Sequence, residues 1–219
     1  EIYHMKINAP QIMGLKESGP IINQIIELQV KELPVEKFLF TSEILSDEDL
    51  SGIDYNCTEF DNCRFMNCRF DKASFKSIRF KHCDLSNCSF ESCYFTQVEF
   101  ISCKGVGCRF QNTSMKDVLF SESNFTYSNF GHSKLQKMIF SSSDFSNAYL
   151  AECKLKEMEI NDVSFNGCDF FKTPLRGIDL RNSRIDGLLI SDGFKELEGV
   201  TVDLYQAAGL ARFLGVNIK

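Results

Sequence analysis

The 219-residue sequence has little of what membrane proteins, metalloproteins and most enzymes need. It contains only three His residues and no run of about 18 apolar residues that could span a bilayer. No signal-peptide pattern opens the chain, and residues 1–4, ahead of Met5, look like an expression remnant. These absences predict a cytoplasmic protein that does not associate with membranes.

Large apolar residues recur at every fifth position from Leu50 to Ile190, with Gly105 as the one exception. Most of the 21 Phe residues lie in this register. A period of five matches neither a helix, with its period of 3.6, nor a strand, with its period of 2.0. The pattern therefore predicts a repeat architecture.

A second, smaller slot lies two residues before each large centre, and its bulky occupants recur every 20 positions. They are Ile78, Val98, Val118, Met138, Met158 and Ile178. Two extended residues followed by a turn make one short side of a coil, which is one pentad. Because the bulky occupants recur every 20 positions, four pentads make one turn of the coil. The sequence predicts an all-β solenoid with 20 residues per coil, in which residues 20 apart lie above one another.

The ten Cys residues follow this repeat. Nine of them occupy the small slot: Cys63, Cys68, Cys83, Cys88, Cys93, Cys103, Cys108, Cys153 and Cys168. Zinc sites have Cys residues two to four apart with His nearby, which is not the pattern here. We therefore expect buried free thiols in a reducing compartment, with no metal and no disulfide.

No catalytic constellation is visible. His82 and His132 both fall two residues after a large centre, at corners more than two coils apart, without a nucleophile partner fixed by the sequence. The serines between Ser121 and Ser146 occupy repeat slots. No Gly-rich loop follows a strand to bind phosphate. We expect neither enzyme activity nor a cofactor.

Gly105 and Met115 are the irregular core positions. At Gly105, either Val106 turns inward to fill the gap or the coil bulges. Met115 is a flexible filler in a column of Phe and Leu.

Acidic and basic residues balance between positions 50 and 190, so the formal net charge of −6 arises from the two ends. One candidate acidic partner patch comprises Glu157, Glu159, Asp162 and Asp179, and the alternative is ordinary surface charge beside Lys156 and Arg181. Leu119 and Ile139 point outward on the same side. They form either an apolar contact strip or ordinary exposed surface.

Several stretches follow the motif of the pentapeptide-repeat family, a small residue, Asp or Asn, then Leu or Phe. They include Cys83-Asp84-Leu85, Ser123-Asn124-Phe125, Ser143-Asp144-Phe145 and Cys168-Asp169-Phe170. The resemblance covers about two thirds of the chain and implies a right-handed quadrilateral β-helix over residues 50–190.

Within the C-terminal segment 191–219, the tail from Asp203 to Lys219 resembles the end of Qnr-type quinolone-resistance proteins, in a helix with a Gln-Ala step and a Leu-Gly pair. Asp203 can cap the start of this helix and Gly215 can end it. Its apolar residues cover more than one stripe, so we expect a C-terminal cap that also forms a homodimer. They are Leu204, Ala207, Ala208, Leu210, Ala211, Phe213 and Leu214.

Residues 5–49 leave the register and contain Pro10, Pro20 and Pro34. Ile21, Ile22, Ile25 and Ile26 could form one helical face, whereas Ile26, Leu28 and Val30 alternate as in a strand. Either way, this segment is expected to cap the first coil, whose open end would present unpaired backbone.

The Qnr resemblance implies binding to DNA gyrase and topoisomerase IV by imitation of duplex DNA. A rod of balanced charge fits only partial mimicry, because phosphate imitation needs dense negative charge. The unbroken register leaves Lys104–Gly107 as the only candidate for a projecting loop of the kind that plasmid-type Qnr proteins use. A scaffold or interaction module for an unrelated protein is the alternative function, and neither function involves direct binding of nucleic acid.

Overall fold

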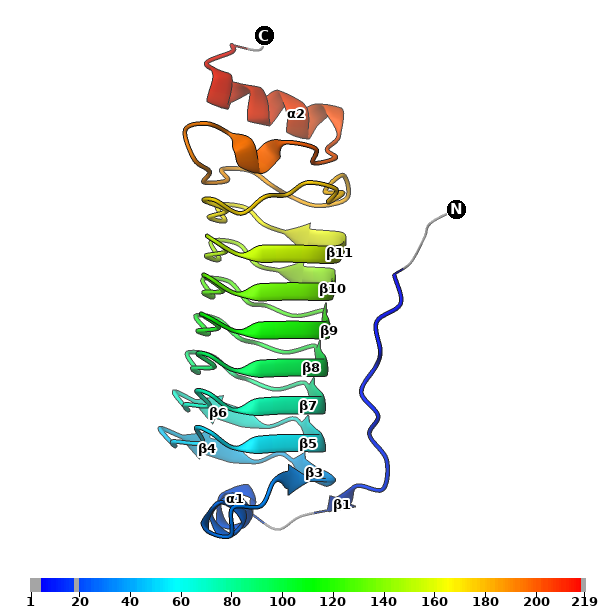
Figure 1. Ribbon diagram of the computed structural model, residues 1–219, viewed down its shortest axis with the longest axis vertical. Coiled ribbons are helices and arrows are strands. Elements are labelled where there is room, and N and C mark those ends of the chain that lie inside the picture. Colours follow the sequence, from blue (N-terminus) through cyan, green and yellow to red (C-terminus); the bar gives the residue numbers. More distant parts are fainter. Residues whose placement is uncertain (1–4, 18–19, 218–219) are drawn as a thin grey trace.

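A computed structural model describes residues 5–17 and 20–217 and shows a parallel β-solenoid with a helix at each end (Figure 1). The strands of the main sheet lie in the order β1-β3-β5-β7-β8-β9-β10-β11, and β4 pairs with β6. The strands are β1 (Lys16–Glu17), β2 (Val35–Glu36), β3 (Phe38–Thr41), β4 (Ile44–Ser46), β5 (Asp54–Asp61), β6 (Arg64–Met66), β7 (Ser74–Lys81), β8 (Tyr94–Ile101), β9 (Ser114–Ser121), β10 (Lys134–Asp144) and β11 (Lys154–Ser164). The helices are α1 (Ile21–Val30), η1 (Lys195–Leu197), α2 (Leu204–Leu210) and η2 (Ala211–Leu214).

Residues 20 apart are paired along the main sheet from β3 to β11. Tyr55 lies beside Phe75, Phe75 beside Phe95, and Phe95 beside Met115, always in parallel strands. The predicted right-handed quadrilateral coil of four pentads is therefore confirmed. The four eight-residue strands β5, β7, β8 and β9 each continue around one corner, and the longer β10 and β11 also continue around a second corner. The main sheet therefore covers two of the four sides along most of the rod.

The corners use left-handed backbone at residues other than glycine. Positive φ angles recur at every fifth position, two residues after each centre: Cys57, Asn62, Asn67, Lys72, Ser77, His82, Asn87 and Ser92 are examples. Left-handed backbone is unfavourable for residues with a Cβ, and Asn and Asp tolerate it best. The repeat imposes this conformation because each side must turn within a single residue.

Phe rings fill the core in columns that run along the rod. Phe60 and Phe80 stack with their centroids 4.9 Å apart and an interplanar angle of 8°, and Phe80 stacks on Phe100 at 5.1 Å. Neighbouring rings within a coil meet edge to face, as Phe60 and Phe65 do at 78°. Both arrangements are favourable for aromatic pairs, so the core gains contacts in two directions.

The coil starts three pentads earlier than Leu50. Val35, Phe40 and Leu45 are buried in register below Tyr55, Phe60 and Phe65. The expectation that residues 35–49 leave the register is wrong. It arose because apolar residues at other positions, such as Phe38 and Leu39, obscure the period in this segment.

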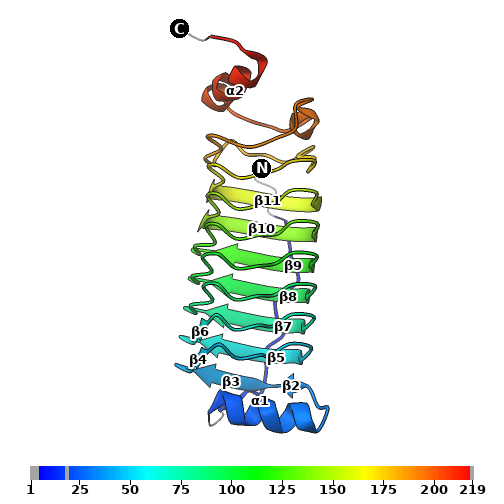
Figure 2. The same ribbon diagram turned by 90° about the vertical axis from the view of Figure 1, so that its left-hand side faces the viewer.

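Helix α1 lies across this first coil and buries Ile21 and Ile25 against it (Figure 2). The helical alternative for this segment is confirmed, because Ile21–Val30 forms a helix. Ile21 and Ile25 are one helical turn apart and so lie on the same face of it. The helix covers the end of the coil, where the apolar core would otherwise meet solvent.

Residues 5–15 do not belong to this cap. They run along one side of the rod, from β1 towards β11 (Figures 1 and 2). The backbone N–H of Met5 donates to Glu159 in β11, and the Asn8 amide contacts Asp117 in β9. The expectation of a cap over the whole of residues 5–49 is corrected here, and we call residues 5–15 the arm.

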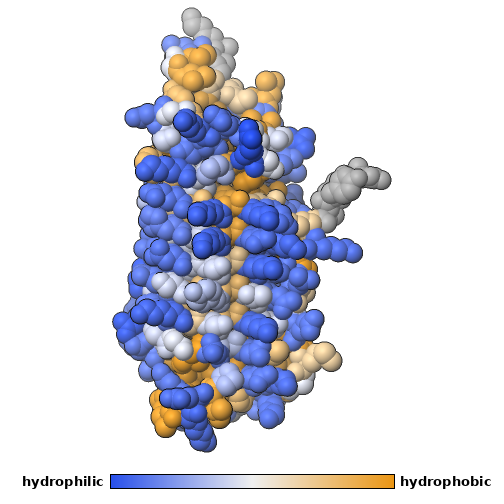
Figure 3. All heavy atoms as spheres, viewed as in Figure 1, coloured by the Kyte–Doolittle hydropathy of each residue, from blue (hydrophilic) through white to orange (hydrophobic). Residues whose placement is uncertain are grey.

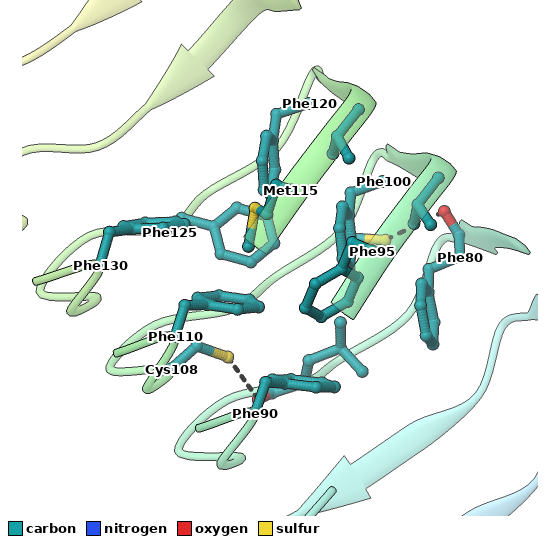
Figure 4. Packing of buried hydrophobic residues seen from close by; sticks show 14 of the residues in the cluster. Phe80, Phe90, Phe95, Phe100, Cys108, Phe110, Met115, Phe120, Phe125 and Phe130 are labelled. Carbon is teal, nitrogen blue, oxygen red and sulfur yellow. Dashed lines mark hydrogen bonds between the residues drawn. The ribbon is translucent and has the colours of Figure 1, made fainter. Parts of the chain in front are cut away.

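Gly105 is accommodated neither by Val106 nor by a bulge. A Cβ atom at Gly105 would lie 2.1 Å from Cε1 of Phe125, so the Phe125 ring of the next coil fills the missing volume. This ring packs edge to face with Phe100 and Phe120 (Figure 4). Met115 is buried as predicted. The ladder continues through Lys104 and Asn124, so residues 104–107 form no projecting loop.

The backbone ladder is interrupted above β11. Among the described residues, no backbone hydrogen bond joins 154–161 to 174–181, where Pro174 lacks an N–H group. Residues 175–180 instead bond upward, as Leu175 N–H does to the Glu196 carbonyl at 2.9 Å. Leu155, Met158 and Ile160 are consequently only half-buried. We call this break the seam.

Candidate interaction surfaces

The small slot of the repeat has a chemical requirement that the sequence analysis missed. Its Cys, Ser and Thr side chains donate to the carbonyl of the residue 23 positions earlier, in the coil below. Cys88 Sγ lies 3.1 Å from the Phe65 carbonyl, Cys108 Sγ 2.9 Å from that of Leu85, and Ser133 Oγ 2.8 Å from that of Phe110. Where the slot holds Cys, Ser or Thr, the side chain therefore supplies a partner for a buried carbonyl as well as a small packing group.

The thiols are free, and nine of the ten are buried. Burial is the main cause that raises the pKa of Cys153 to about 11 and that of Cys168 to about 12. A neutral thiol is a poor nucleophile and a poor metal ligand. The interpretation of these residues as packing cysteines is confirmed by their contacts.

The candidate acidic residues each contact a donor or a basic group. Glu157 lies 3.6 Å from Lys156, Asp162 lies 3.7 Å from Arg184, and Glu159 accepts the Met5 N–H. Glu157, Glu159 and Asp162 share β11, whereas Asp179 lies across the seam.

Asp179 forms a two-pronged ion pair with Arg181, with atoms as close as 2.6 Å. The hydrogen bond from Arg181 holds the pKa of Asp179 below its usual value. The negative charge of Asp179 is thus balanced locally by Arg181.

Charges on the same side of the rod alternate in sign from one coil to the next. Arg79 bonds Glu99 at 2.8 Å above it and Glu59 at 3.1 Å below it. Cross-strand pairs of opposite charge stabilise a sheet. This ladder keeps the surface near neutrality over several coils, which also disfavours mimicry of duplex DNA by the whole rod.

Leu119 and Ile139 lie directly beside one another on β9 and β10, as predicted. They are half-buried and do not form an exposed strip. The arm crosses this side of the rod, where Asn8 bonds Asp117. The expectation of an exposed contact strip is therefore corrected, because both side chains are half-buried on the side along which the arm runs.

The C-terminal helix is held at its start by a capping box. Asp203 accepts the Gln206 N–H at 2.8 Å, and the Gln206 side chain accepts the Asp203 N–H at 2.8 Å. The Gln206 amide also donates to the carbonyls of Leu180 and Ser183 in the coil below. Gly215 ends η2 with a left-handed backbone, so both predicted helix boundaries are confirmed.

The outward side of this helical end remains apolar. Leu210 packs against the core, whereas Leu204 is 82% exposed and Leu214 is 70% exposed. Ala207 and Phe213 are also exposed, and Ala208 and Ala211 are half-buried. A stretch of α2 and η2 with one side on the rod and an apolar side in solvent is typical of an interface.

Each of the two corner histidines lies beside one carboxylate. His82 Nδ1 lies 3.2 Å from Asp61 and His132 Nδ1 lies 3.7 Å from Glu152, both at exposed corners. His82 also lines a shallow polar groove of about 450 Å³, whose charged residues are mixed in sign. Within residues 5–17 and 20–217, no cluster of His, Cys, Asp and Glu is placed to hold a metal, and no helix could cross a membrane.

Two family models match adjoining parts of the chain. One, described as pentapeptide repeat region, matches residues 73–142, and the other, described as pentapeptide repeats (8 copies), matches residues 143–185. Together these ranges span just over half of the sequence. No curated protein matches the chain in sequence.

Solved structures of similar fold include full-length QnrB1, a plasmid-mediated fluoroquinolone resistance protein. Its identity is 24% and its TM-score 0.48, over 82% of this chain and 91% of that chain. HetL, a pentapeptide repeat protein involved in heterocyst differentiation regulation from the cyanobacterium Nostoc, has 12% identity and a TM-score of 0.31, over 84% and 97% of the two chains.

Proposed function

The chain belongs to the pentapeptide-repeat family, and we propose that it is a non-enzymatic, dimeric protein that binds DNA gyrase or topoisomerase IV and protects it from quinolones. The observation that carries the proposal is the C-terminal end. Its capped helix has the Gln-Ala step and Leu-Gly pair of Qnr-type proteins, and its outward side is apolar. The buried free thiols suit a cytoplasmic location, where such targets act.

The proposed dimer joins two rods through α2 and η2. Burying the exposed Leu204 and Leu214 would gain roughly 1.5–3 kcal/mol for each side chain. Replacing both residues with Glu should yield monomers in light scattering, whereas the wild type has twice the chain mass. Val30→Glu is the matched control, because Val30 is 81% exposed at the opposite end of the rod. An unchanged mass for the double variant would exclude this interface.

Mimicry of DNA is proposed to be local and not spread over the rod. β11 is the last strand before the proposed joint, with residues 165–203 of each subunit between it and α2, so Glu157, Glu159 and Asp162 of the two subunits would lie on either side of the joint. Their negative charge would be felt together near the joint, although each carboxylate also has its own contact.

The test is quinolone-inhibited supercoiling by purified gyrase, with the protein added at micromolar concentration. Supercoiling should recover with the wild type and not with the monomeric Leu204→Glu/Leu214→Glu variant. If the wild type leaves inhibition unchanged, the topoisomerase proposal is dropped.

The second candidate function is an interaction module for an unrelated protein. It is favoured by the alternating charges of Glu59, Arg79 and Glu99, which leave little resemblance to phosphate rows. A pull-down that returns one reproducible partner and no topoisomerase would support this alternative.

A further inference from the structure

The arm lies on the rod as an extended segment with an inner and an outer side. Met5, Ile7, Pro10, Ile12 and Leu15 are half-buried, and most of the residues between them are exposed. This spacing is near that of an extended chain, whose side chains alternate between two sides. The arm therefore presents apolar side chains to the rod at regular intervals.

Several polar side chains on the side of the rod beneath the arm are buried, although they lie at outward positions of the coil. Asp117 is only 2% exposed, whereas His82 and Asn62, which take the equivalent place at another corner of the coil, are exposed. Glu99 and Ser77 on the same side are also buried. Buried carboxylates need hydrogen-bond donors, so the side has a built polar position and not just a flat apolar surface.

Asp117 receives two hydrogen bonds from one residue of the arm. The Asn8 backbone N–H lies 3.1 Å from Oδ1, and the Asn8 side-chain Nδ2 lies 3.1 Å from Oδ2. A carboxylate that accepts both groups favours a short side chain that donates, as asparagine does here. Leu119 and Ile139 supply the neighbouring apolar surface.

The arm is held without a backbone ladder. Among the described residues, the first backbone hydrogen bond of this segment is that of Lys16 N–H to the Lys37 carbonyl, and β1 pairs with β3 over two residues only. Residues 5–15 contribute no side chain to the buried core of the coil. The arm can therefore leave the rod while the solenoid stays intact.

We propose that this side of the rod is a docking surface for an extended peptide of a partner protein, and that the arm occupies it in competition. The chemistry of the arm defines the fitting segment: Asn over Asp117, preceded by an apolar residue as Ile7 precedes Asn8, with further apolar residues two and four positions later, as Pro10 and Ile12 are. This inference does not rest on a topoisomerase as the partner.

The experiment uses a fluorescent peptide with the sequence of residues 5–15 and the full-length chain, measured by fluorescence anisotropy. Asn8→Ala in the chain weakens the arm and leaves the rod unchanged, so this variant should bind the peptide at least tenfold more tightly than the wild type. Adding Asp117→Asn should remove that gain. A peptide with Asp in place of Asn, which meets the Asp117 carboxylate, should bind at least tenfold more weakly.

Far-UV circular dichroism and thermal denaturation verify that the variants keep the solenoid. Equal peptide affinity for the wild type and the Asn8→Ala chain, or for Asn8→Ala with and without Asp117→Asn, would overturn the proposal. If the arm instead bound a second copy of the chain, Asn8→Ala would lower the mass measured by light scattering. That result would overturn the proposal that the arm competes for the surface of its own rod.

Discussion

Replacing Gly105 with Ala should destabilise the solenoid through contact with a single ring. The added Cβ would lie 2.1, 2.4 and 2.9 Å from Cε1, Cδ1 and Cζ of Phe125, whereas carbon atoms pack at about 3.5–4.0 Å. The ring cannot withdraw freely, because it packs edge to face on Phe120 with centroids 4.9 Å apart. Overpacking of a core costs about 1–3 kcal/mol or more, and a displacement of this size places the cost at the upper end.

A second effect of the Gly105→Ala substitution is stabilising, so a measured loss of stability would show that the clash with Phe125 outweighs it. Gly→Ala also reduces the conformational freedom of the unfolded chain, which stabilises a protein by about 0.4–1 kcal/mol. We expect a net loss of about 2 kcal/mol for Gly105→Ala. Gly193→Ala is the matched control, because its nearest neighbour would be 3.9 Å away, and it should gain stability.

Thermal denaturation of the two variants and of Phe125→Leu provides the assay. Leu lacks Cε1, the ring carbon nearest to Gly105, and Cζ, so Gly105→Ala should cost less in a Phe125→Leu background, and the double-mutant cycle should show coupling. The reasoning is refuted if Gly105→Ala is as stable as the wild type, or if the two substitutions are additive.

Three further predictions concern other buried groups. Tyr55→Phe should stabilise the protein by about 1–3 kcal/mol in thermal denaturation, because the buried Tyr55 hydroxyl has no hydrogen-bond partner among the described residues; a loss of stability would show that it has one. A thiol reagent at neutral pH should modify only the half-buried Cys57 quickly, and all ten thiols once the chain is unfolded; rapid reaction of several native thiols would contradict their burial. Burial alone would raise the pKa of Glu196, but hydrogen bonds from its own N–H, from Ser191 and from the Lys172 N–H lower this pKa overall. The ionised Glu196 should therefore stabilise the fold above about pH 4.3, the ordinary pKa of Glu, and this stabilisation should be lost as the pH falls through the lower pKa of the folded state. Glu196→Gln should flatten that acid dependence in thermal denaturation, and an unchanged profile would assign it to other carboxylates.

The coil itself could be predicted from the sequence because every pentad repeats one environment. The large centres, the small slot and the outward corners all recur at fixed spacing, and the bulky residues of one column, such as Ile78 and Val98, identify the side where strands continue around a corner. Local pattern and global fold agree along the rod, so a single register is sufficient.

The remaining features depend on contacts between residues far apart in sequence. Asn8 and Asp117 are 109 positions apart, and no periodicity links them. The Phe125 ring fills the space beside Gly105 because of its orientation in the next coil, which the sequence does not show. The donor role of the small slot had a visible signal, because Cys, Ser and Thr share a polar hydrogen, but smallness explained the same residues equally well.

The seam divides the protein in a way that the even spacing of the coils conceals. In a stack of repeats, the folded state spreads from one unit to the next through the interface that they share. Between β11 and the coil above it, half of that interface lacks backbone hydrogen bonds, while residues 175–180 are tied firmly to the turn that carries Glu196 and α2. We therefore expect cooperativity to be weakest at this point and the C-terminal turn to form a folding unit of its own. The end that would join two subunits can thus lose or regain its order while the Phe columns below it remain folded.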